Sequence, residues 1–229
     1  MKFLSNYIKE GLKIGSKTKV NSYKYYPENR NELKELIKKL LNERGKNANL
    51  NDIDISKITD MSLLFNDLDP HNINISKWDV SKVTNMENMF CYCKNFNSDL
   101  SKWNVSNVEN MESMFEFCEN FNSDLSKWDV SNVKNMYSMF KKCVNFNSDL
   151  SKWNVSNILD TSYMFYKCEN FNSDLSKWNM SNNIYTYYMF YKCKNFNSDL
   201  NKWDMAKVKK MTNMFTGSIL EKNPPKWYK

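Results

Sequence analysis

The strongest constraint on the fold is a 25-residue repeat that occupies most of the chain. Six of the seven tryptophans are spaced 25 residues apart, and phenylalanine, cysteine and the pentapeptide FNSDL recur at the same step. A short unit cannot bury its own apolar side chains, so neighbouring units must stack to form a common core. The repeat therefore predicts a solenoid of seven coils over residues 53–217, with a degenerate first copy at 53–77. The repeated tryptophans are Trp78, Trp103, Trp128, Trp153, Trp178 and Trp203.

Each unit combines two hydrophobic periods. Trp103 and Val105 alternate with polar residues, which indicates a short strand. A second group follows the i, i+3, i+4, i+7 spacing of one helix face. The expected fold class is therefore an α/β solenoid with one strand and one helix in each repeat. In the unit that begins at Trp78, the helical positions are Met86, Met89, Phe90 and Cys93.

The unit also resembles a known family. The run Leu100-x-x-Trp103-x-Val105-x-x-Val108 has the frame of a leucine-rich repeat. The complete 25-residue unit closely resembles the repeat of BspA-like leucine-rich-repeat surface proteins, which is also seen in mycoplasma lipoproteins and proteins of large viruses. The resemblance implies a right-handed coil stack and a surface or interaction protein: an adhesin, a binder of host proteins or an adaptor. It implies no catalytic residue and no cofactor.

The two ends of the chain depart from the repeat. Residues 1–24 form a basic N-terminal arm, either an amphipathic segment for a membrane surface or partner, or a loosely ordered tail. Residues 25–52 are expected to form an N-terminal cap, with a helix over 31–44 that Gly45 ends. Residues 218–229, with Leu220 and Trp227, are expected to close the other end.

Positive charge is concentrated at the start of the chain. The net charge is +7, and residues 1–50 hold 12 Lys and Arg against 5 Asp and Glu. This asymmetry supports an alternative function, binding of nucleic acid or an anionic membrane through residues 1–50. A solvated lysine-rich face would give the same composition.

The recurring polar residues do not indicate a catalytic or metal-binding site. The cysteine row shares a face with methionine and phenylalanine, so we expect buried structural thiols, with Cys91 outside the row as the reactive one. Each repeat supplies one aspartate with a lysine three residues later, which argues against a calcium site. The single histidine, His71, replaces a core phenylalanine. We therefore expect no enzyme activity, no metal and no cofactor.

Differences between the copies point to a binding surface. The early copies carry glutamates on the outward side of the expected helices, whereas the later copies carry tyrosine and lysine. Tyrosine suits a protein or glycan interface, because it buries a large area at low entropic cost. Neutral variation is the alternative, and nucleic acid is the least favoured partner. The predicted partner-binding residues are Tyr163, Tyr166, Lys167, Tyr187, Tyr188, Tyr191 and Lys192.

The start of the sequence lacks the pattern of a secretory signal peptide, and no apolar run reaches the ~20 residues of a membrane span. We therefore expect a cytoplasmic, virion-associated or unconventionally exported protein, whose oligomeric state the sequence leaves open.

Overall fold

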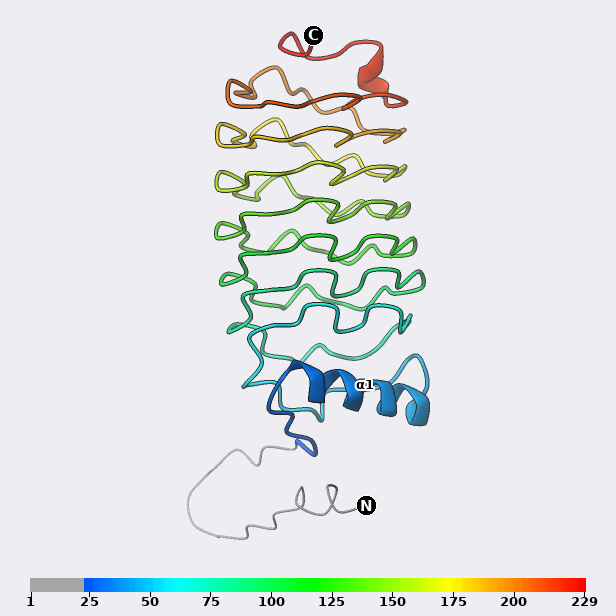
Figure 1. Ribbon diagram of the computed structural model, residues 1–229. Helices are drawn as coiled ribbons and strands as arrows, with labels where there is room; N and C mark the ends of the chain where they lie inside the picture. Colours follow the sequence, from blue (N-terminus) through cyan, green and yellow to red (C-terminus); the bar gives the residue numbers. More distant parts are fainter. Residues whose placement is uncertain (1–22) are drawn as a thin grey trace.

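Successive copies of the repeat lie directly on one another along a single axis (Figure 1). The computed structural model describes residues 23–229, so the predicted arm over 1–24 falls almost entirely outside the described residues. At one end of the stack lies helix α1 (Arg30–Arg44), and near the other end lies the short 3-10 helix η1 (Ile219–Glu221). The predicted stack of repeats is confirmed in this respect.

Buried aromatic side chains form a ladder along the axis of the stack. Phe90 lies parallel to Phe115, with 5.6 Å between ring centroids, and Phe115 lies 5.7 Å from Phe140. A second phenylalanine column runs beside the first, with Phe96 and Phe121 5.8 Å apart. All of these rings are fully buried. The aromatic residues that recur in the sequence therefore supply the core that a single unit lacks.

The tryptophan column combines burial with a hydrogen bond. The indole Nε1 of Trp128 donates to the carbonyl of Leu100, 28 residues earlier, at 3.1 Å. The tryptophans from Trp78 to Trp203 repeat this bond. A buried indole N–H needs an acceptor, and the stack provides the same one in every coil.

The expected strand and helix of each repeat are not found. Within residues 23–229 the regular elements are α1 and η1, together with isolated parallel bridges such as Asn85↔Asn110. The segment from Met86 to Cys93 is a row of tight turns, because Asn88 and Tyr92 have positive φ angles of 54° and 62°. A right-handed helix requires a negative φ at every residue. Turns repeated every four residues return side chains to one face as a helix does, which explains the misleading spacing.

Alternate amides in these turns bond to the next coil. The N–H groups of Met86 and Asn88 donate to the carbonyls of Asn110 and Glu112 at 2.9 and 2.8 Å. Other amides of the segment close turns within the coil, as in the bond from the Met89 N–H to the Met86 carbonyl. The bonds of this row all run from an N–H in one coil to a carbonyl in the following coil. The row is therefore polar, with carbonyls directed toward the first end and amides toward the last.

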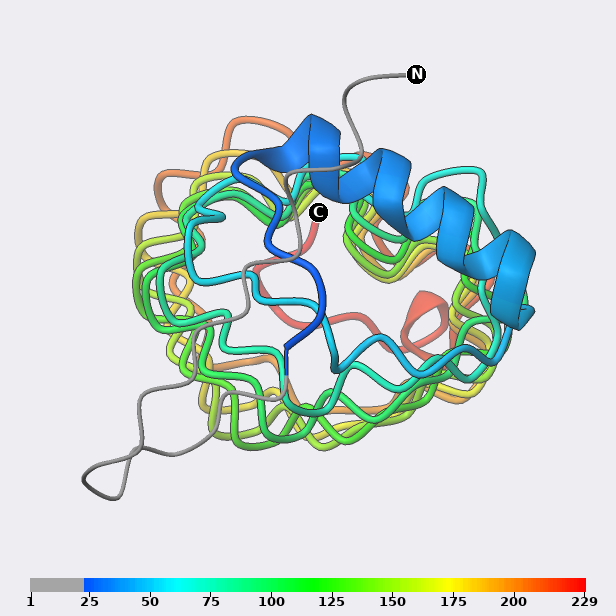
Figure 2. The same ribbon diagram turned by 90° about the horizontal axis from the view of Figure 1, so that it is seen from below.

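Helix α1 lies across the first end of the stack (Figures 1 and 2). The side chain of Asn29 accepts hydrogen bonds from the first helical amides, and Gly45, with φ 81°, ends the helix. Leu33, Ile37 and Leu40 are fully buried in the common core. The predicted helix over 31–44 is confirmed. None of the helices in residues 23–229 is long and apolar enough to cross a bilayer.

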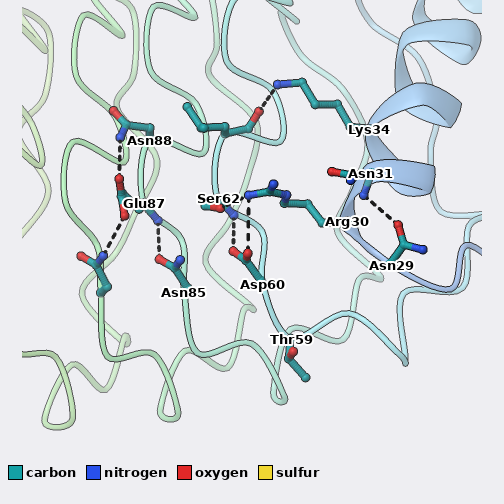
Figure 3. Close-up of polar contacts among 12 residues, drawn as sticks. Asn29, Arg30, Asn31, Lys34, Thr59, Asp60, Ser62, Asn85, Glu87 and Asn88 are labelled. Carbon is teal, nitrogen blue, oxygen red and sulfur yellow. Dashed lines mark hydrogen bonds and ion pairs between the residues drawn. The ribbon is translucent and has the colours of Figure 1, made fainter.

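Basic side chains of this region contact acceptors of the first coil (Figure 3). Lys34 donates to the carbonyl of Leu63, and Lys46 donates to that of Leu68. Arg30 donates to the Ser62 hydroxyl and lies 3.5 Å from the Asp60 carboxylate. Part of the positive charge near the start of the chain is thus held in contacts with the first coil.

The last end is covered by a segment that partly imitates another coil. Trp227 stacks on Trp203, with ring centroids 6.3 Å apart, and its Nε1 donates to the Leu200 carbonyl at 2.7 Å. Leu220 of the same segment is buried in the common core. This segment therefore continues the tryptophan column past the last full repeat.

Candidate partner-binding face

The turns between the repeated methionines and cysteines present their remaining side chains outward, and these side chains differ along the stack. In the early coils most of these side chains are polar, as at Glu87 and Asn88, beside one stacked aromatic pair, Tyr92 and Phe117, with 4.6 Å between ring centroids. In the later coils six tyrosines gather, which we call the tyrosine face. Its members are Tyr137, Tyr163, Tyr166, Tyr187, Tyr188 and Tyr191.

The six rings contact one another as one continuous surface. Tyr163 lies parallel to Tyr188 at 5.0 Å between centroids, and Tyr166 lies parallel to Tyr191 at 4.8 Å. Tyr187 meets Tyr163 edge-on at 5.2 Å. Each of these side chains is half-buried. Their mutual packing restricts the rings before any partner arrives, which lowers the entropic cost of binding.

Three lysines lie over rings of this face. The Nζ atoms of Lys141 and Lys167 are 5.4 and 5.5 Å from the ring centroids of Tyr163 and Tyr166. Lys192 has the same relation to Tyr191, at 5.3 Å. These are cation–π distances. The face therefore combines aromatic area with positive charge.

Two hydroxyl groups of the face, those of Tyr163 and Tyr187, are held in the protonated form by their surroundings. Burial, together with the neighbouring tyrosines, raises the pKa of Tyr163. Burial and the Asp160 carboxylate raise the pKa of Tyr187. The hydroxyl of Tyr188 accepts a hydrogen bond from the side-chain Nδ2 of Asn213 at 2.9 Å. The face can thus supply hydrogen bonds as well as apolar area.

The structure brings the seven predicted partner-binding residues together, although on turns instead of helices. The five predicted tyrosines belong to the face, and Lys167 and Lys192 lie on its rings. Tyr137 and Lys141 were not in the predicted set but contact Tyr163. The repeat step carries a signal for Tyr137, because it occupies the same position in its coil as Tyr187.

A shallow depression of about 420 Å³ adjoins Tyr137 at one border of the face. Leu159, 47% exposed, lies on its wall with Lys134. Glu112, Asn135 and Asp160 complete the polar part of the lining. Such a depression can receive one side chain of a bound protein, with its apolar part against Leu159.

The cysteines form a structural row. The Cys143 thiol is fully buried and donates to the carbonyl of Phe115 at 2.9 Å, and the other cysteines of the row repeat this bond. The prediction that Cys91 is reactive is wrong, because its side chain is 3% exposed and burial raises its pKa to about 12. A thiol in this setting is rarely ionised at neutral pH.

The aspartate row closes turns. The Asp124 carboxylate accepts the Ser126 amide at 2.9 Å, and the Ser126 hydroxyl and amide lower the pKa of Asp124. The same arrangement recurs at Asp99, Asp149 and Asp174. In residues 23–229 no three His, Cys, Asp or Glu side chains converge as the ligands of a metal would.

Comparison with known proteins gives one match. The family model described as "Mycoplasma protein of unknown function, DUF285" matches residues 32–143 and again residues 118–227. Together the two matches span the coil stack and most of α1. No curated protein matches the chain, and no solved structure does.

Proposed function

The chain belongs to the Mycoplasma DUF285 family, and we propose that it is a non-catalytic interaction protein that binds a partner protein through the tyrosine face. The observation that carries this proposal is the contact among six tyrosine rings on one side of the stack. The likeness of the repeat to BspA-like leucine-rich-repeat surface proteins supports an adhesive or adaptor role for the same face.

Aromatic rings that are fixed before binding are typical of interface hot spots. Tyr163 contacts four other tyrosines, so its ring is held on several sides. The lysines over the rings add donors at the border of the face, where they favour a partner with acidic or carbonyl groups. The depression beside Leu159 offers a place for one anchoring side chain.

A second candidate is the binding of nucleic acid or an anionic membrane through residues 1–50. Contacts within the protein weaken it, because Arg30 and Lys34 bond to the first coil. Arg44 pairs with Asp52 at 2.9 Å. These three cations are only partly available to an external anion.

The test is co-purification from native extract with the variant Tyr187→Ser/Tyr188→Ser/Tyr191→Ser, at two salt concentrations. Serine already stands at two of these repeat positions, in Ser162 and Ser138, so we expect the variant to fold. The matched control is Glu87→Ser/Asn88→Ser/Tyr92→Ser, which alters the outward turn residues of an early coil.

Loss of a specific partner from the tyrosine variant alone is the expected result. Retention by both variants, with release at high salt, would contradict the proposal and move the function to residues 1–50. Equal loss from both variants would show that the tyrosines have no special role.

A further inference from the structure

The amide end of the stack has donors without acceptors. In the sixth coil, the N–H groups of Thr186, Tyr188 and Phe190 donate to carbonyls of the seventh at 2.9 to 3.0 Å. The equivalent donors of the seventh coil belong to Met211, Asn213 and Phe215. These three have no acceptor among the hydrogen bonds of residues 23–229.

The next amide in the same row has found a carboxylate. The Gly217 N–H donates to the Glu221 side chain at 2.9 Å. Asn213 and Gly217 have positive φ angles of 54° and 76°, so the row continues the alternation of turns seen in earlier coils. Successive amides in such a backbone form concave sites that favour anions. Glu221 shows that this edge accepts a carboxylate.

The segment after Gly217 covers only part of this end. Tyr228 packs against Phe215, with centroids 5.0 Å apart, and Trp227 covers Trp203. Val208 and Met211, in contrast, are partly exposed, although the equivalent residues of the earlier coils are buried. Phe215 is only 1% exposed under this segment, so the uncovered part of the amide row is that of Met211 and Asn213, which are both partly exposed.

The charge of this end matches the polarity of its amides. Residues 201–229 contain seven lysines and two carboxylates, those of Asp204 and Glu221. Lys209 and Lys210 directly precede the amide row, and both are exposed. Lysine charge and amide dipoles together produce a positive potential at this end.

We infer that the edge formed by Met211 and Asn213 binds an acidic peptide segment of a partner. Main-chain or carboxylate oxygens of the peptide accept these two N–H groups, as the carbonyls of a further coil would. The side-chain carboxylates of the peptide lie near Lys209 and Lys210. This edge adjoins the tyrosine face, because the side chain of Asn213 donates to the Tyr188 hydroxyl. The inference does not depend on that face.

A second copy of the chain does not fit this edge. Helix α1 lies across its carbonyl end and obstructs the approach of a second stack (Figures 1 and 2). Its amide end would oppose donors to donors and lysines to lysines. Charge complementarity therefore favours an acidic segment.

The experiment uses the full chain and a fluorescein-labelled ten-residue peptide of alternating glutamate and glycine. Binding is measured by fluorescence anisotropy, and the amide shifts of Met211 and Asn213 are followed by NMR. We expect both amides to shift on addition of the peptide. The charge reversal Lys209→Glu/Lys210→Glu should weaken binding about tenfold.

Two further variants sharpen the test. Lys102→Glu/Lys127→Glu makes the same charge change at exposed sites in earlier coils, and it should alter affinity by less than about twofold. Glu221→Gln removes the internal carboxylate while keeping its shape, and should tighten binding.

Three outcomes would overturn the inference. They are an absence of shifts at the Met211 and Asn213 amides, equal weakening by the two charge reversals, and an equally tight complex of ten-nucleotide single-stranded DNA with the same shifts. The last would assign the edge to nucleic acid.

Discussion

The coils of residues 78–127 and those of residues 128–202 share one interior and differ in their outward turns. The core rings are spaced alike, at 5.6 Å between Phe90 and Phe115 and 5.6 Å between Phe165 and Phe190. Outside, the early coils carry acidic side chains such as Glu112, whereas the later coils carry the tyrosine face. The comparison teaches that the interior sets the stack and leaves the outward turn positions free to vary.

The backbone explains this freedom. The bonds between coils use main-chain groups, and the left-handed positions accept Asn88 and Ser113 as well as Tyr163. An outward residue therefore changes the surface while the stack below it stays the same. The two regions meet where Lys141 of the later part pairs with Glu116 of the earlier part at 2.8 Å.

The largest effect is expected in the shared interior. Phe115→Ala and Phe140→Ala each remove a fully buried ring, and each should lower the free energy of unfolding by about 3–5 kcal/mol. Urea unfolding measures both. Because the two regions share one core, the two values should agree within about 1 kcal/mol. If one variant alone lost less than about 3 kcal/mol, the cores of the two regions would not be equivalent.

The boundary between the regions should give the next largest effect. Burial lowers the pKa of Lys141, but the hydrogen bond and charge of Glu116, together with Tyr137 and Tyr92, raise it, and the net effect is a raised pKa that holds the ammonium as a cation. Lys141→Ala leaves Glu116, whose side chain is 13% exposed, without its partner and should cost about 1–2 kcal/mol.

The matched control is Lys134→Ala, which breaks a solvent-exposed pair with Glu109. It should cost less than about 0.5 kcal/mol in the same unfolding experiment. Equal costs for the two variants would mean that the boundary pair is no more important than an ordinary surface pair.

The left-handed positions distinguish the regions with a smaller effect. Ser113→Gly relieves a positive φ of 50° and should stabilise the protein by roughly 0.5 kcal/mol. Tyr163→Gly relieves a φ of 57° but loses the ring contacts, and should destabilise by about 1 kcal/mol. Thermal unfolding of the two variants gives the signs. Stabilisation by both would show that the tyrosine contacts contribute nothing to the fold.

The smallest effect is a pH dependence that both regions should share. The Ser126 hydroxyl and amide hold the pKa of Asp124 below its ordinary value of about 3.9. The contribution of the ionised Asp124 to the free energy of unfolding is therefore complete above that ordinary value. The contribution is lost as the pH falls through the lower folded pKa. Asp174 has the same arrangement with Ser176 in the later coils.

Asp124→Asn and Asp174→Asn keep an acceptor oxygen but lose the titration. The difference in stability between each variant and the parent protein should therefore shrink as the pH is lowered from 5 to 2. A difference that stays constant with pH would contradict the proposed role of the turn carboxylates.

Sequence periodicity predicted the stack because burial of Trp128, Phe115 and their equivalents depends on the repeat alone. It did not predict the backbone conformation correctly. Turns repeated every four residues place Met86 and Phe90 on the same face, and so does a helix, so the spacing does not distinguish the two. Glycine would have indicated the left-handed positions, but Asn88 and Tyr92 occupy them instead.

The candidate site was predictable to a similar degree. The step of 25 residues indicated that Tyr163 and Tyr188 are neighbours in adjacent coils. It did not indicate that Lys167 lies over Tyr166, nor that a depression forms beside Leu159. Such details depend on side-chain directions in the turns, which the repeat period does not specify.

The most direct test of a binding face confined to the later coils is site-specific photo-crosslinking in native extract. A photoreactive phenylalanine analogue replaces Tyr166 in one protein and Tyr92, an exposed ring of an early coil, in the other. We predict a single cross-linked partner from position 166 and none from position 92. The same partner captured equally at both positions, or at neither, would contradict the claim that the tyrosine face binds it.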